Sequence, residues 1–197
     1  MKKSNFYLLY SGDKSLLSNE VNKLKKNLNI TSDSIYYDIE NVSDIIVEAS
    51  TIGMFDPYKF IVIDSGSYFL QKSEFDISLL EEYFNNYNTN SYLIFILNSG
   101  SVDSKKKLYK LINDNGTINK LSVTEEYLDT FVRNYIKDNG FTMNNMDIKF
   151  FLGRCNKDID NIKNELDKLM LYKLEEKVID KDDIILPQKK IFYNKKE

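Results

Sequence analysis

The sequence predicts an α/β fold in which a parallel sheet carries helices on both faces and a small helical domain follows. Two observations support this prediction. Up to about residue 121, short apolar runs alternate with amphipathic segments of helical length, which is typical of parallel βαβ units. After Thr124 the apolar residues recur only at helical spacing. A chain of 197 residues is long enough for one domain plus a small second one.

The first domain is expected to contain five strands, at residues 6–10, 35–39, 60–63, 92–97 and 117–121. Run 60–63 is uninterrupted and mostly β-branched, so we expect a strand that is buried on both faces. Run 92–97 is the most hydrophobic, so its strand is expected at the centre of the sheet. Between these strands the spacing predicts helices at 16–28, 43–51 and 78–85, and one that follows the lysines at 105–107. The third helix is expected to direct these side chains inward: Leu79, Leu80, Tyr83 and Phe84.

From Thr124 onward we expect only helices. The first has Thr124 as its cap and ends at Gly140, and the second ends near Gly153. The third is capped by Asn156 or Asp158, and a short segment at 178–185 follows it. We therefore place the domain boundary at about residue 122, with an α/β domain at 1–122, a helical domain at 123–186 and a linker at 187–197.

The amino-acid composition argues against several classes of function. The chain has no histidine, which removes the usual general base, the common nucleophilic dyads and most zinc sites, so no catalytic residue or metal ligand set is expected. A net charge of −3 and only two arginines argue against a dedicated nucleic-acid surface. The single Cys155 fits a reducing compartment. No run is long enough to span a membrane, so a cytoplasmic protein is expected.

The turn after the first strand has the position of a phosphate-binding loop. Such a loop needs the pattern G-x-x-x-x-G-K-[ST], because only a long glycine-rich loop wraps its amides around phosphates. Here only three residues, Ser11, Gly12 and Asp13, lie between the expected strand and the pair Lys14 and Ser15. The loop is too short, and Asp13 would place a carboxylate where the anion binds, so we expect Asp13 to cap the helix. A P-loop NTPase that binds nucleotide around Lys14 and Ser15 is the less favoured alternative, and no cofactor is expected.

A phosphoacceptor receiver domain is the second alternative. It would use Asp13, Asp64 at the end of the third strand, and a lysine such as Lys105 beyond a later strand. A receiver domain has no reason to continue into a helical domain, however. We expect Asp64 to be a turn residue and the lysines at 105–107 to form a solvated face.

The turn at 53–57 carries two large apolar residues, Met54 and Phe55, at a place where a loop would normally be polar. Taken alone, the pair has two interpretations. It could fold back as a small satellite core, which is the simpler reading, or it could be presented to a partner.

An α/β domain followed by a three-helix lid resembles the domain arrangement of AAA+ proteins. Local sequence patterns narrow this resemblance to one family. The opening at 7–13, the stretch 49–63 with its apolar pair before a strand, and residues 103–106 after the central strand resemble the delta subunit of bacterial DNA polymerase III. Segment 158–169, followed by Tyr172, is the closest match. The resemblance covers essentially the whole chain, and the order of the motifs carries more weight than any one of them.

This resemblance implies a clamp-loader subunit that binds and opens the sliding clamp in DNA replication without hydrolysing ATP. An active ATPase would carry a sensing arginine near the start of the third lid helix, where this chain has residues 160–163 without arginine. The resemblance implies that Met54 and Phe55 plug a pocket on the clamp, which favours the second interpretation of the pair. The possible neighbours in this contact are Ile52, Tyr58 and Phe69.

Other loader subunits, delta prime and gamma/tau, would bind through a collar domain that this chain lacks. DNA would be reached indirectly, through the complex. Residues 187–197 look like the linker into that collar domain, and we therefore expect the sequence to be either a naturally truncated gene product or a shortened piece of a longer subunit.

Overall fold

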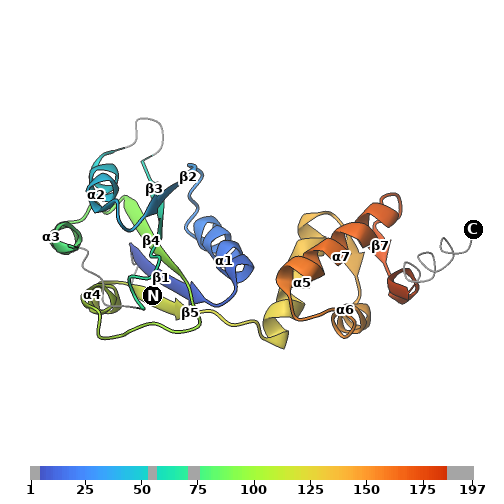
Figure 1. Cartoon of the computed structure of the whole chain (residues 1–197). Coiled ribbons are helices and arrows are strands. Elements are labelled where there is room, and N and C mark those ends of the chain that lie inside the picture. The colour runs from blue at the N-terminus through green and yellow to red at the C-terminus, as the bar shows by residue number, and fades with distance from the viewer. Residues whose placement is uncertain (1–4, 53–56, 71–75, 186–197) are drawn as a thin grey trace, which may run out of the picture. The chain divides into compact units, whose positions relative to one another are not determined.

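The computed structural model describes residues 5–52, 57–70 and 76–185 (Figure 1). Its internal contacts divide the chain into two compact units: unit 1, residues 1–122, and unit 2, residues 123–197.

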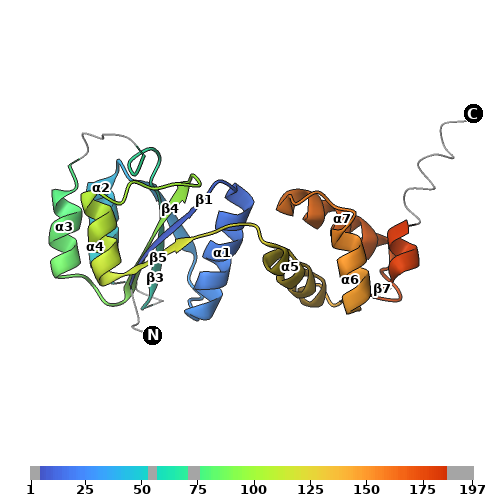
Figure 2. The same cartoon turned by 90° about the horizontal axis from the view of Figure 1, so that it is seen from below.

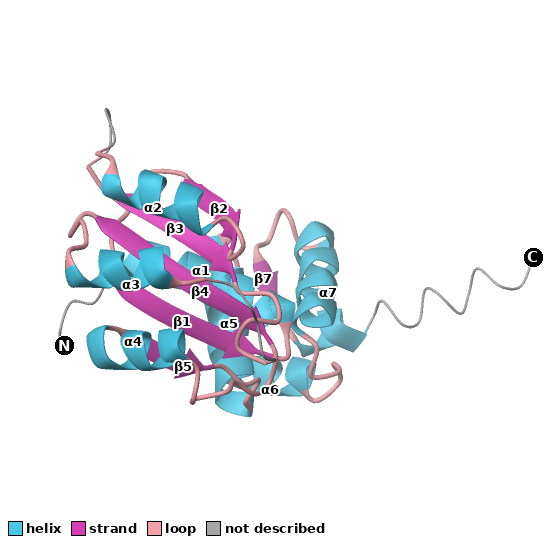
Figure 3. Cartoon of the chain, turned by 60° about the vertical axis from the view of Figure 1, so that its left-hand side comes forward, coloured by secondary structure: helices cyan, strands magenta, loops and turns pink. Residues whose placement is uncertain are grey.

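Unit 1 is built on a five-stranded parallel sheet with the order β2-β3-β4-β1-β5 (Figure 3). The strands are β1 (Phe6–Ser11), β2 (Ser34–Asp38), β3 (Lys59–Asp64), β4 (Ser91–Asn98) and β5 (Thr117–Lys120). In the register, Leu93 of β4 lies opposite Phe6 on one side and Ile61 on the other. The most hydrophobic strand is therefore at the centre of the sheet, as the sequence predicted.

Helices cover both faces of this sheet. Figures 1 and 2 show α1 (Lys14–Asn27) on one face, with α2 (Val42–Ser50), α3 (Ser78–Asn85) and α4 (Lys107–Asn115) on the other. Adjacent side chains of a strand point to opposite faces, so Leu8 packs in the core under α2, α3 and α4, while Leu9 packs in the core under α1. The α/β class with helices on both faces is confirmed.

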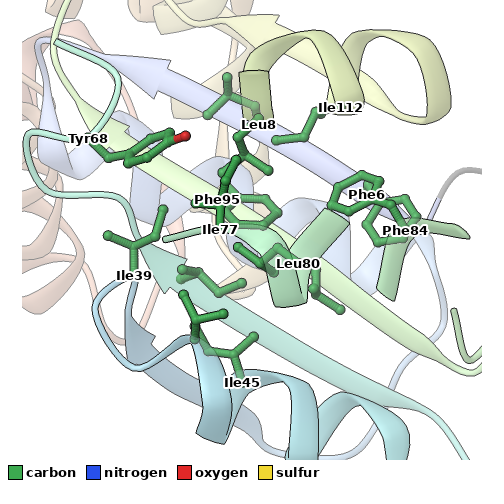
Figure 4. Close-up of a cluster of buried hydrophobic side chains, with 14 of the residues drawn as sticks. Phe6, Leu8, Ile39, Ile45, Tyr68, Ile77, Leu80, Phe84, Phe95 and Ile112 are labelled. Atoms are coloured by element: carbon green, nitrogen blue, oxygen red, sulfur yellow. The ribbon is translucent and has the colours of Figure 1, made fainter. Parts of the chain in front are cut away.

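The larger core contains a dense aromatic contact between β1 and α3. The ring of Phe6 stacks on that of Phe84 with centroids 3.9 Å apart (Figure 4). Strand β3 contributes to both cores, because Ile61 and Ile63 enter the larger one and Phe60 and Val62 the smaller one. None of these four side chains is more than 1% exposed, so β3 is buried on both faces as expected.

One expected core position in unit 1 is wrong. Leu79 of α3 was expected to face inward, but its side chain is 44% exposed. The buried face of α3 consists of Leu80, Tyr83 and Phe84, which are spaced at i, i+3 and i+4. Leu79 lies one residue before this stripe and points away from the core.

Unit 2 contains α5 (Glu125–Asp138), α6 (Asn145–Leu152) and α7 (Ile159–Tyr172). Thr124 caps α5 as predicted, since its hydroxyl accepts a hydrogen bond from Tyr127 N at 3.1 Å. Of the two candidate caps of α7, the structure selects Asp158, which accepts from Asn161 N at 2.7 Å.

The expectation that unit 2 is entirely helical is wrong. Strands β6 (Thr142–Met143) and β7 (Val178–Ile179) form a two-stranded parallel sheet. Gly140 has a φ of +78°, a conformation that glycine adopts readily, and it turns the chain out of α5 towards β6. Strands of two residues are too short to show a period of two in the sequence.

Among the described residues, no helix is both long enough and apolar enough to cross a membrane.

Candidate functional site

The turn between β1 and α1 does not have the geometry of a phosphate-binding loop. Strand β1 ends at Ser11 and α1 begins at Lys14, so the connection has two residues, Gly12 and Asp13. The carboxylate of Asp13 accepts a hydrogen bond from Leu16 N at 2.9 Å. A carboxylate thus takes the place at the helix N-terminus where an anion would bind, and the predicted capping role of Asp13 is confirmed.

Asp64 at the end of β3 also takes part in a local turn. Its carboxylate accepts a hydrogen bond from Gly66 N at 2.9 Å, and Gly66 has a φ of +48°. Within the described ranges, no group of three or more acidic or cysteine residues could hold a metal ion. The geometry of Asp64 favours its interpretation as a turn residue.

The α2–β3 loop, residues 51–58, is the candidate partner-binding site. Met54 and Phe55 lie outside the described residues. On either side of them, Ile52 is 75% exposed and Tyr58 is 43% exposed, although both are large and apolar. Phe69 is fully buried in the larger core and offers no surface to a partner, so we leave it out of the contact.

The two ends of the α2–β3 loop are joined by Lys59, the first residue of β3. Its ammonium donates hydrogen bonds to the carbonyl oxygen of Glu48 at 2.8 Å, to the carboxylate of Glu48 and to the hydroxyl of Thr51. The Thr51 hydroxyl in turn donates to the same carbonyl oxygen at 3.0 Å. These bonds connect the last turn of α2 directly to the start of β3.

A second set of bonds holds the C-terminal turn of α2 to the rest of unit 1. The carbonyl oxygen of Ala49 accepts from Ser91 Oγ at 2.7 Å, from Tyr83 Oη at 3.2 Å and from Asn88 Nδ2 at 3.3 Å. The last carbonyls of a helix have no partner within it, so these side chains supply the missing donors. Burial raises the pKa of Tyr83, which keeps its hydroxyl protonated as a donor. The end of α2 from which the loop starts is therefore held firmly to the rest of unit 1.

Sequence reasoning did not single out Lys59 or Ser91. Ser91 lies 42 residues after its partner Ala49, and no local pattern announces a bond over that separation. The available signal for Lys59 was its position, because a charged residue at the start of a strand that is buried on both faces needs a partner.

Comparisons with known proteins give the family and the fold of the chain. Residues 4–122 match the family described as DNA polymerase III, delta subunit. The Bacillus subtilis DNA clamp loader delta protein superposes with a TM-score of 0.67 at 16% identity, over 92% of this chain and 57% of that one. The Thermotoga maritima RuvB Holliday junction branch migration motor superposes with a TM-score of 0.55 at 12% identity, over 91% of this chain and 59% of that one.

At these identities the two structures establish the fold, which is AAA+-like. This chain spans less than two thirds of the length of either protein. No curated protein matches the chain by sequence.

Proposed function

The chain belongs to the family of DNA polymerase III delta subunits, and from this premise we propose that it is a clamp-loader subunit that binds and opens a sliding clamp without hydrolysing ATP. The proposal rests on a loop that carries apolar residues and whose two ends are held in place by hydrogen bonds. Ile52 and Tyr58 expose apolar surface on both sides of Met54 and Phe55, and the base is held by Lys59.

In this proposal Met54 and Phe55 enter a pocket on the clamp, with Ile52 and Tyr58 at the edge of the contact. Burying a Phe or Met side chain fully contributes about 1.5–3 kcal/mol each. Two such side chains in one pocket are typical of a binding hot spot, in which a few large residues supply most of the affinity.

The β1–α1 turn supports the part of the proposal that concerns ATP. A two-residue connection cannot surround a phosphate with amides, and the Asp13 carboxylate would repel the phosphate. At the start of α7, Asp158 is the cap and Asp160 lies in the first turn, where a nucleotide-sensing arginine would be needed. Both features favour a subunit that works on the clamp while other subunits hydrolyse ATP.

The proposed partners are the sliding clamp and the other loader subunits, delta prime and gamma/tau. Contact with those subunits would use a collar domain, and DNA would be approached through the assembled complex. The clamp contact lies within unit 1, so we expect this chain to bind the clamp by itself.

The test is binding of the chain to the sliding clamp of its own organism, measured by calorimetry. The double variant Met54→Ala/Phe55→Ala should lose most of the affinity. A matched control is Leu171→Ala/Leu174→Ala, which truncates two apolar side chains of unit 2 that are 68% and 57% exposed. This control should bind like the wild type.

Circular dichroism and thermal unfolding would verify that all variants fold. Fluorophores across the clamp interface would report ring opening. A wild type that binds ATP tightly but not the clamp would overturn the proposal and require the turn at Gly12 to be interpreted again.

A further inference from the structure

We infer that Lys59 is a positioning residue for partner binding, because it joins the two ends of the α2–β3 loop and so sets the places of Ile52 and Tyr58. The inference rests on the proposed function and extends it to a residue that does not itself touch the partner.

The first step is the chain geometry. Seven residues, 52–58, separate Thr51 from Lys59. Fully extended, seven residues could span about 25 Å. Instead, the Lys59 ammonium lies within hydrogen-bonding distance of the Thr51 hydroxyl. The Lys59 side chain therefore bridges the end of α2 and the start of β3.

The second step is the completeness of the bonding. An ammonium group has three donors, and Lys59 has three acceptors around it: the Glu48 carbonyl, the Glu48 carboxylate and the Thr51 hydroxyl. Its side chain is 11% exposed and that of Glu48 is 29% exposed. Lys59 has little surface left for a partner, so its influence on binding must pass through the loop.

The third step is the attachment of each loop end to the sheet. Ahead of the loop, the Ala49 carbonyl is bonded to Ser91 of β4. Behind it, Ser32 Oγ donates to Tyr58 O at 2.9 Å, and Lys59 N donates to Asn90 O at 2.9 Å. These bonds tie each end separately to β4 or to residues just before β2 and β4, whereas the Lys59 ammonium connects one end to the other.

The consequence for binding is pre-organisation. Residues that are already held in place, such as the two ends of this loop, lose less conformational entropy on binding a partner. Removing the ammonium should therefore weaken clamp binding by about three- to tenfold without removing any contact surface.

The experiment compares clamp affinity for the wild type, Lys59→Met and Lys59→Arg. Methionine keeps the apolar stem and loses the donors, and arginine restores a charged donor and should recover part of the affinity. Lys107→Met is the matched control. Lys107 pairs with Glu81 at 2.6 Å in the same unit, its side chain is 70% exposed, and its loss should leave clamp binding unchanged.

A combined variant and an exchange measurement distinguish a positioning role of Lys59 from a general loss of stability. In the Met54→Ala/Phe55→Ala background, Lys59→Met should cost no further affinity, because the loop it positions has already lost its anchors. Hydrogen–deuterium exchange over residues 51–59 should accelerate in Lys59→Met and stay unchanged in Lys107→Met. If Lys59→Met does not fold, Glu48→Gln/Thr51→Val weakens the same bonds while keeping the lysine stem.

Clamp affinity equal to the wild type in Lys59→Met, with unchanged exchange, would overturn the inference. A wild type that binds no clamp would overturn the proposed function instead, and the exchange measurement alone would then decide whether Lys59 holds the loop.

Discussion

The hydroxyl of Ser91, the first residue of β4, donates a 2.7 Å hydrogen bond to the carbonyl oxygen of Ala49 in the last turn of α2. Both residues are buried, with exposures of 1% and 0%. The bond joins the helix that precedes the candidate partner-binding loop to the central strand of the sheet. The base of that loop is consequently a part of the core of unit 1.

Ser91→Ala should lower the free energy of unfolding by about 0.5–1.5 kcal/mol, the usual net contribution of one hydrogen bond. Larger losses are not expected, because Tyr83 and Asn88 still donate to the Ala49 carbonyl. Urea denaturation measures the change. Ser18→Ala, at an exposed position of α1, is the control and should stay within about 0.5 kcal/mol of the wild type. Equal effects of the two substitutions would contradict this role of Ser91.

Asp13→Ala should destabilise the protein by about 1 kcal/mol, because the first turn of α1 loses its capping acceptor for Leu16 N. Asp13→Ser should retain most of the stability, since serine is an equally good cap. Thermal unfolding of the two variants tests the capping role. Neither variant should acquire tight ATP binding, because the turn keeps its length. Tight ATP binding by Asp13→Ser would show that the carboxylate alone had excluded the nucleotide.

Gly116→Ala should be more damaging than Gly100→Ala. A Cβ at position 116 would collide with the backbone carbonyl of Phe6 and lie 2.9 Å from that of Ile112, whereas nothing lies within 4 Å of a Cβ at position 100. Overpacking against backbone typically costs about 1–3 kcal/mol. Chemical denaturation of both variants gives the comparison, and similar stabilities would mean that β1 and α4 can move apart at little cost.

Tyr135 should make stability depend on pH in the alkaline range. Burial, together with the hydrogen bond that its hydroxyl donates to Asp167 at 2.7 Å, raises the pKa of Tyr135 from 10.0 to about 12. The folded state therefore holds this proton more tightly than the unfolded state. The resulting stabilisation is complete below pH 10 and is lost as the pH rises from 10 towards 12.

Denaturation series between pH 9 and 12 test this dependence. Tyr135→Phe should show a shallower loss of stability over that range than the wild type. Asp167→Asn removes the charge beside the hydroxyl and brings the folded-state pKa of Tyr135 closer to 10, so the loss should be smaller than in the wild type and should level off at a lower pH. Identical curves for the wild type and Tyr135→Phe would contradict the assignment.

Much of the fold could be predicted from local patterns. The apolar run at 60–63 indicated a strand buried on both faces, and β3 has that burial. The run at 92–97 indicated the central strand, and β4 lies between β3 and β1. Leu79 was placed on the wrong side because helical spacing defines an apolar stripe, and the edges of that stripe are decided by the neighbouring elements.

The candidate site could be predicted only in part. The apolar pair Met54 and Phe55 was recognisable as unusual for a turn, and its proposed role came from family resemblance. The structure describes the flanking Ile52 and Tyr58 as exposed and Phe69 as buried. Phe69 had been named as a possible neighbour, and its place in the core depends on the packing of the whole domain.

By itself, the sequence determined the class of the fold, the central strand and the inability of the Gly12–Asp13 turn to surround a phosphate. These properties depend on hydrophobic periodicity, side-chain type and loop length, all of which are local. The tertiary structure alone decided that Lys59 bonds to the end of α2, that Ser91 bonds to Ala49, and that β6 pairs with β7. Such contacts join residues from 8 to more than 40 positions apart. Their formation depends on how whole helices and strands pack, which a pattern of neighbouring residues does not encode.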